Sequence, residues 1–241
     1  MKPSLLRETD LTNAHFLARH ARLGCIGLAG GDTFIDHAIA RAQRRLDAAG
    51  QWSRWSHAFF FQGVRPDGHH WVIESDLQFH HKHIQLGVQE NRASKYHDEK
   101  TYTRLAVLDF GLTPAQTQRL LTEALELVAT HTQYSIAELL GTLLALRHQR
   151  LRAARNLLAR DRALFCSALV RHLFQHVGVD LAPGVAVKNT APEDLARSPQ
   201  LVKGFELERP QPATLLERLD RKIFSVKTRL RAARKKRSCR S

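Results

Sequence analysis

Apolar residues recur at helical spacing in several parts of the chain, and the clearest example begins at Cys166. From there to Val177 they follow the i, i+3, i+4, i+7 spacing of a helix that faces a core. Gly178 predicts the end of this helix. The pattern places the Cys166 thiol in the first turn of an amphipathic helix. The apolar positions are Cys166, Leu169, Val170, Leu173, Phe174 and Val177.

A helix N-terminus is a place where a cysteine becomes reactive. Unpaired backbone N–H groups and the positive end of the helix dipole favour the thiolate there. The position of Cys166 therefore predicts a nucleophile. A small buried side chain on the core face of the helix is the alternative role for this cysteine.

Other stretches predict an alternation of helices and strands. Thr113, Pro114 and Gln116 have the residue types of an N-cap, first turn and capping box. The aromatic stretch Trp52–Phe61 predicts a buried strand. The predicted helices lie within 1–22 and over 35–49, 114–128, 136–158 and 166–177. The predicted strands lie over 52–61, 71–74, 105–110 and 201–207, and residues 24–35 predict a loop and one short strand.

The residues between the strands at 52–61 and 71–74 predict a hairpin. A four-residue turn over 65–68 would place Val64 opposite His69, and directly opposed residues of antiparallel strands share a face. Glu74 would then lie diagonal to His57, about 7–8 Å away between backbones, within reach of the side chains. A slip of one residue would separate them. The residues expected on this face are His57, Phe59, Glu74 and Asp76.

The composition is that of a globular protein with free thiols. The chain has 241 residues, enough to bury a sizeable core, with 43% hydrophobic and 25% charged residues. Its three cysteines, Cys25, Cys166 and Cys239, form no C-x-x-C pair and no even framework. We therefore expect reduced thiols in a reducing compartment.

The positive charge belongs mainly to the end of the chain. The net charge is +14, but residues 217–241 contain eleven Lys or Arg and two acidic residues, so +9 lies there. Apolar residues between Leu216 and Leu230 recur every three or four positions, which predicts a basic amphipathic helix or tail over 210–241. Such a helix suits an anionic membrane, with docking on the domain as the alternative, and a nucleic acid is not the expected partner. The oligomeric state is left open.

The sequence contains no apolar run of about 20 residues that would span a membrane and no secretory signal at its N-terminus. We expect the protein to be cytoplasmic as synthesised. Export by a signal-independent route, such as an antibacterial toxin would use, stays open.

Neither a nucleotide loop nor a zinc site is indicated. The four glycines between residues 24 and 31 are irregularly spaced, with no GKS or GKT after them. Five histidines gather between residues 69 and 83, but no cysteine or carboxylate stands at ligand spacing and no H-E-x-x-H occurs. Solvated loop histidines are the better account, and we expect no metal and no other cofactor. The histidines are His69, His70, His80, His81 and His83.

A thiol at a helix start, a histidine at a strand start and a carboxylate on the next strand are the parts of a papain-type centre. Their order here is His57, Glu74, Cys166, whereas papain has its cysteine first. The surrounding motifs, in chain order, are Gly31-Asp32, Trp55-Ser56-His57-Ala58-Phe59, Val72-Ile73-Glu74-Ser75, Leu105–Asp109, Gly111-Leu112-Thr113-Pro114-Ala115-Gln116, Gln133-Tyr134-Ser135, Phe165-Cys166-Ser167-Ala168-Leu169-Val170, Thr190-Ala191-Pro192-Glu193-Asp194-Leu195 and Ser198-Pro199.

With these motifs, residues 24–207 resemble the permuted NlpC-like papain-fold cysteine hydrolases of the YiiX/YaeF type, relatives of lecithin:retinol acyltransferase-like proteins. The resemblance implies an α+β fold: a papain-like, circularly permuted antiparallel sheet packed against helices. It makes Cys166 the nucleophile, His57 the general base and then acid, and Glu74 the group that orients His57. Tyr134 and Phe59 are the candidate substrate-binding residues, with a core role as the alternative for Tyr134.

Three departures from the family affect the expected substrate. Ala168 and Ser135 stand where the family more often has acidic residues, and residues 136–160 form a longer, basic helical insertion. The expected reaction is cleavage of an amide bond in a peptide or peptidoglycan through a thioester. A lipid-directed acyl hydrolase or acyltransferase at anionic membranes is one alternative. A non-enzymatic module that binds anionic surfaces or nucleic acid is the other.

The expected organisation has three parts. Residues 1–23 form an N-terminal helical segment, residues 24–209 the catalytic domain, and residues 210–241 the basic tail. Pro210 and Pro212 mark the second boundary.

Overall fold

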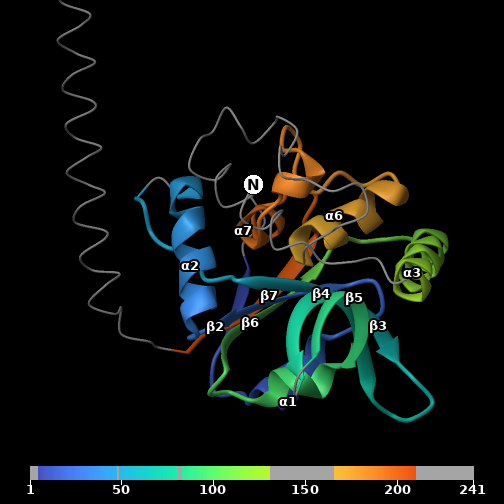
Figure 1. The fold of residues 1–241 in the computed structure, drawn as a ribbon, viewed down its shortest axis with the longest axis horizontal. Helices are drawn as coiled ribbons and strands as arrows, with labels where there is room; N and C mark the ends of the chain where they lie inside the picture. The colour runs from blue at the N-terminus through green and yellow to red at the C-terminus, as the bar shows by residue number, and fades with distance from the viewer. Residues whose placement is uncertain (1–4, 48, 81–82, 131–165, 210–241) are drawn as a thin grey trace, which may run out of the picture.

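The computed structural model describes residues 5–47, 49–80, 83–130 and 166–209, with the backbone alone for 45, 76–80 and 83–86. Its centre is a seven-stranded sheet (Figure 1) with the order β1-β7-β6-β2-β3-β4-β5. Neighbouring strands are antiparallel except β1 and β7, which are parallel. The strands are β1 (Leu6–Glu8), β2 (Ile26–Gly31), β3 (His57–Val64), β4 (His70–His80), β5 (His83–Arg92), β6 (Tyr102–Asp109) and β7 (Lys203–Leu207).

Helices cover both faces of this sheet, and α6 and α1 lie on opposite sides of it in Figure 1. Phe60 belongs to the core on the side of α3 and α6, and Phe59 to the core on the side of α1. This confirms the predicted α+β class and is consistent with the papain-like fold that the resemblance implies. The helices are α1 (Asn13–His20), α2 (Phe34–Ala42), η1 (Gln43–Leu46), η2 (Ala93–His97), α3 (Pro114–Ala129), α6 (Cys166–His176), η3 (Val187–Asn189) and α7 (Pro192–Ala196).

The two helices with the strongest sequence signals are confirmed. Thr113 accepts a hydrogen bond from the backbone N–H of Gln116, and the Gln116 side chain accepts one from the backbone N–H of Thr113, so α3 begins with the predicted capping box. Helix α6 ends at His176, two residues before Gly178. The predicted helix over 136–160 and the tail over 210–241 lie outside the described residues.

The hairpin of β3 and β4 has the predicted register near its start but a different turn. Val64 pairs with His70 instead of His69, while Phe60 pairs with Ile73. The register shifts at Gln62, between these two pairs, because a bulge there takes up one residue. Continuing the Phe60 pairing by one residue places Phe59 opposite Glu74, as predicted.

Two strands were not predicted. β1 lies in the segment that was expected to be only helical, and it pairs with β7 at the edge of the sheet. β5 pairs with β4 along ten residue pairs, so β4 is much longer than the expected strand over 71–74. His80 and His83 pair with each other across the two strands, which corrects their expected placement in a loop.

Gly27 leaves room for a buried aromatic ring. A Cβ atom at this position would lie 2.1 Å from the Phe59 ring, which crosses β2 at this point. We expect Gly27→Ala to lower the free energy of unfolding by about 1–3 kcal/mol, because the ring is enclosed and must shift. Urea unfolding measures this loss.

A double variant tests the cause of that loss. Phe59→Leu removes the ring atoms that the new methyl group would meet, so the losses of Gly27→Ala and Phe59→Leu should sum to more than the loss in the double variant. Additive losses would contradict the steric explanation.

None of the described helices has the length and the apolar run needed to cross a membrane.

Candidate active site

The central hairpin brings an imidazole and a carboxylate together. His57 is the first residue of β3, and Glu74 lies in the middle of β4. The Nε2 atom of His57 lies 2.6 Å from Oε2 of Glu74. The Glu74 side chain is completely buried, while 17% of the His57 side chain is exposed. The predicted pair is therefore formed, with the carboxylate on the buried side of the ring.

Three further side chains donate hydrogen bonds to the Glu74 carboxylate. Asn91 Nδ2 and Lys95 Nζ each lie 2.8 Å from Oε1. The Tyr96 hydroxyl donates to Oε2, the same oxygen that accepts from His57. Four donors thus satisfy this buried carboxylate, which would otherwise be costly to remove from water.

Sequence reasoning missed these three residues because it did not predict β5, which carries Asn91 and leads into η2 with the other two. The alternation of Ile84, Leu86 and Val88 is a strand signal that would have revealed β5. No motif would have singled out Lys95 or Tyr96.

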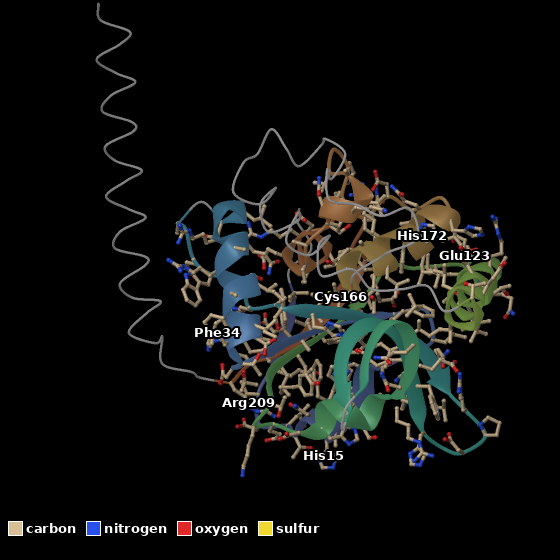
Figure 2. The ribbon with its side chains drawn as sticks, viewed as in Figure 1. His15, Phe34, Glu123, Cys166, His172 and Arg209 are labelled. Atoms are coloured by element: carbon tan, nitrogen blue, oxygen red, sulfur yellow. The ribbon has the colours of Figure 1, made fainter. Side chains whose placement is uncertain are left out.

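The thiol reaches the same imidazole from the helix. α6 is described from Cys166 onward, and this cysteine is 8% exposed. The Cys166 side chain lies close enough to the His57 imidazole to act on its charge. Because Glu74 occupies Nε2, Nδ1 is the ring nitrogen that remains for the sulfur. Figure 2 shows Cys166 where α6 meets the sheet. Together with the hydrogen bond between His57 and Glu74, this places the three predicted catalytic residues side by side.

The charges of these groups depend on one another. Burial of His57 opposes its protonation, but its contacts with Cys166 and then Glu74 outweigh burial and raise the pKa of His57 well above its usual value. Burial also opposes the ionisation of Glu74, but His57 and Lys95 outweigh it and lower the pKa of Glu74. The arrangement therefore favours an imidazolium beside a carboxylate.

Buried polar contacts fix α6 to the chain that follows it. Ser167 Oγ donates to the carbonyl oxygen of Thr190 at 2.7 Å. The Arg171 side chain, 3% exposed, forms an ion pair with Asp180 and donates to Thr190 Oγ1 and to the carbonyl oxygen of Val185. These bonds tie α6 to residues 180–190 and so limit movement of Cys166.

The Phe59 ring packs in the core next to the site. The side chain is completely buried, and its ring stacks on that of Tyr96 with 4.1 Å between centroids. The prediction that Phe59 binds substrate is therefore wrong, because the ring has no accessible surface. Tyr134 lies outside the described residues, and so does the side chain of Asp76.

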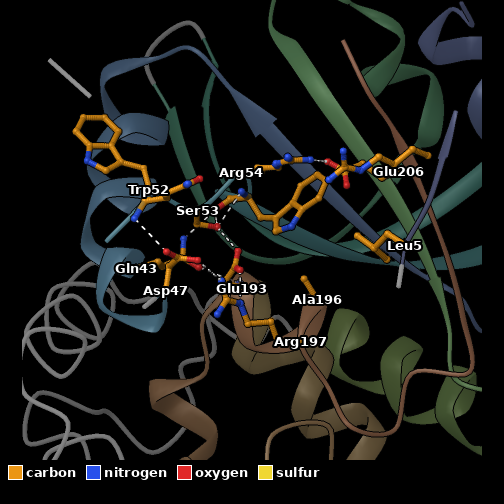
Figure 3. Close-up of a pocket in the computed structure, with 13 residues that line it drawn as sticks. Leu5, Gln43, Asp47, Trp52, Ser53, Arg54, Glu193, Ala196, Arg197 and Glu206 are labelled. Carbon is orange, nitrogen blue, oxygen red and sulfur yellow. Dashed lines mark hydrogen bonds and ion pairs between the residues drawn. The ribbon is translucent and has the colours of Figure 1, made fainter. Parts of the chain in front are cut away.

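A polar pocket of about 390 Å³ lies beside the segment that leads into β3 (Figure 3). Most of its charged side chains pair with one another: Arg54 with Glu206, and Arg197 with both Glu193 and Asp47. Ser53 Oγ donates to Glu193 at 2.7 Å. These pairs connect the segment before His57 to α7 and β7. The charged residues that line the pocket therefore have a structural role, which is to hold these elements together.

Within the described part of the chain, no group of three or more His, Cys, Asp or Glu side chains is placed to hold a metal ion.

No family model and no curated protein matches the chain. Among solved structures it is similar to the metalloprotein yiiX from Escherichia coli O157:H7, described as DUF1105, with 16% sequence identity and a TM-score of 0.49. The aligned region covers 79% of this chain and 98% of the other. A likeness at this level supports no inference about the chemistry, which depends on the geometry of the site.

Proposed function

We propose that the protein is a cysteine hydrolase in which Cys166 attacks an acyl carbon, His57 transfers protons and Glu74 orients His57. The single observation that carries this proposal is the contact of one imidazole with both the Cys166 thiol and the buried Glu74 carboxylate. A nucleophile, an adjacent base and a third group that orients the base are the signature of covalent acyl transfer.

The mechanism follows from the two nitrogens of the His57 ring. The ring takes the thiol proton, and the Cys166 sulfur attacks the substrate carbonyl to form a tetrahedral oxyanion. Collapse of this intermediate breaks the C–N bond as His57 gives its proton to the leaving amine, and a thioester remains. His57 then takes a proton from water, whose oxygen attacks the thioester and releases a carboxylic acid and the thiol.

The backbone N–H of Cys166 is our candidate oxyanion donor, since the attacking residue often supplies one. Glu74 contributes by holding the Nε2–H tautomer, which leaves Nδ1 facing the sulfur.

An amide bond of a peptide or of peptidoglycan is the substrate that we propose. A lipid-directed enzyme would present apolar side chains to the bilayer, but the aromatic run Phe59–Phe61 is completely buried and offers no such surface. Incubation with peptides, muropeptides and anionic phospholipid vesicles in parallel distinguishes the substrates, with release of amine or fatty acid as the readout.

Selective labelling of Cys166 tests the nucleophile. Cys25 is an internal control, because it is also a free thiol but burial raises its pKa to about 12. At pH 6–7 we expect iodoacetamide to modify Cys166 at least tenfold faster than Cys25, measured by peptide mass spectrometry of the folded protein.

The same labelling experiment on the His57→Gln variant tests whether the imidazole makes the Cys166 thiol reactive. Loss of the preference for Cys166 in this variant supports activation by the imidazole. Equal labelling of Cys25 and Cys166 in the unmodified protein would falsify the assignment of Cys166 as nucleophile.

A further inference from the structure

Lys95 is a charged neighbour of the site that the mechanism has not used. Its Nζ atom lies 2.8 Å from Oε1 of Glu74, and its side chain is 22% exposed while that of Glu74 is fully buried. The Nζ atom therefore contacts the oxygen of Glu74 that does not accept from His57. The carboxylate lies between two groups that carry positive charge, His57 when protonated and Lys95.

This position matters because His57 must both hold and release a proton. A buried carboxylate without compensation would stabilise the imidazolium strongly and make it a poor acid for the leaving group. An ammonium ion on the far side of the carboxylate reduces that stabilisation, since its charge opposes that of the imidazolium. Glu74 and Lys95 together carry no net charge.

Of the side chains that the structure describes around His57, the other charged and titratable ones do not supply this compensation. Cys166 on α6 is negative as the thiolate, and Tyr96 on η2 donates to Glu74 through a neutral hydroxyl. Asp36 on α2 is negative and accepts a hydrogen bond from the hydroxyl of Ser56, next to His57. None of these three groups adds positive charge next to Glu74, whereas Lys95 does.

We propose that Lys95 is a positioning and charge-balancing residue, an inference that rests on the proposed hydrolase. Lys95 holds Glu74 in place and keeps His57 acidic enough to protonate the leaving group. The geometry that carries this is the chain of contacts from the Cys166 thiol through His57 and Glu74 to Lys95. Lys95 does not touch substrate in this scheme and acts through Glu74.

Titration of His57 tests this inference without a substrate. With histidine labelled with ¹³C at Cε1, the His57 resonance is the one missing from His57→Gln, and its midpoint is followed against pH. Lys95→Gln keeps a hydrogen-bond donor but removes the charge, so we expect the midpoint to rise by about one pH unit. Lys95→Arg keeps the charge and should leave the midpoint within about 0.3 units.

A midpoint that is unchanged or lowered in Lys95→Gln overturns the inference. If Lys95→Gln does not fold, Lys95→Met serves in its place with the same expected direction, and circular dichroism establishes that the variants are folded. A merely structural role would change stability but would not raise the midpoint.

Activity separates this inference from the proposed function. If the hydrolase is active and Lys95→Gln shifts the midpoint, acylation should slow about threefold because His57 has become a weaker acid. If the protein hydrolyses its substrate but the His57 midpoint is the same in Lys95→Gln, the role of Lys95 is refuted and the proposed hydrolase is not. A shifted midpoint in a protein that cleaves neither amide nor ester bonds refutes the hydrolase and keeps the charge balance.

Discussion

Replacement of His57 by alanine should lower kcat/KM for acyl transfer at Cys166 by about 10²–10⁴-fold, the usual contribution of a general acid–base group. Two losses combine in this variant. The thiol loses the base that takes its proton, and the leaving amine loses its proton donor. The measurement is release of product from whichever amide substrate the parallel assay identifies, at pH 7.

His15 offers a matched control for this variant. It is an exposed histidine in α1, placed away from Cys166 in Figure 2. His15→Ala removes the same side chain without reaching the site, so kcat/KM should change less than twofold. A comparable loss in both variants would show that the effect of His57→Ala is not local.

Glu74→Gln should lower kcat/KM by up to about 10⁴-fold, as the corresponding change does in serine triads by favouring the wrong imidazole tautomer. The amide keeps the shape of the carboxylate but loses its charge, and its NH₂ group can face the Nε2 atom of His57. Glutamine also removes the carboxylate charge that pairs with Lys95. The pH at which His57 loses its proton should therefore fall, opposite to the change expected for Lys95→Gln.

The same substitution should also lower stability in a pH-dependent way. The pKa of Glu74 is lowered in the folded protein from an ordinary value of 4.5. Its contribution is thus fully present above that value and is lost as the pH falls toward the folded pKa. Urea unfolding should show a gap of about 1–3 kcal/mol between the unmodified protein and Glu74→Gln at pH 7, and a smaller gap at pH 3.

Glu90→Gln is the control for the stability measurement. Glu90 also lies on the hairpin sheet and pairs with Arg65, but a quarter of its side chain is exposed. Exposed pairs contribute about 1 kcal/mol or less. An equal gap for Glu74→Gln at pH 7 and pH 3 would contradict the contribution of an ionised Glu74.

The sequence predicted the site where local signals were strong. Helical spacing placed Cys166 on α6, and strand alternation with a turn at 65–68 placed His57 and Glu74 on neighbouring strands. The prediction that His57 and Glu74 share a face of the sheet was correct, even though the predicted turn was wrong. The bulge at Gln62 absorbs the extra residue of the turn, so the error ends before it reaches the site.

The supporting residues could not be predicted in the same way. Lys95 and Tyr96 reach Glu74 only because β5 returns along β4 and delivers η2 beneath the carboxylate. Their role depends on contacts between side chains that are far apart in the sequence, and the spacing of residues along the chain does not predict such contacts. The burial of Phe59 likewise depends on Gly27 in β2, an approach that the glycine pattern alone does not reveal.

The separation of the three groups along the chain has a consequence for folding. His57 and Glu74 are only 17 residues apart and belong to one hairpin, so their pairing requires the closure of a short loop. Cys166 lies far downstream and must bring its helix back across the sheet. During synthesis the His57–Glu74 pair can therefore form first, and the Cys166 thiol meets the imidazole only once α6 has docked on the sheet.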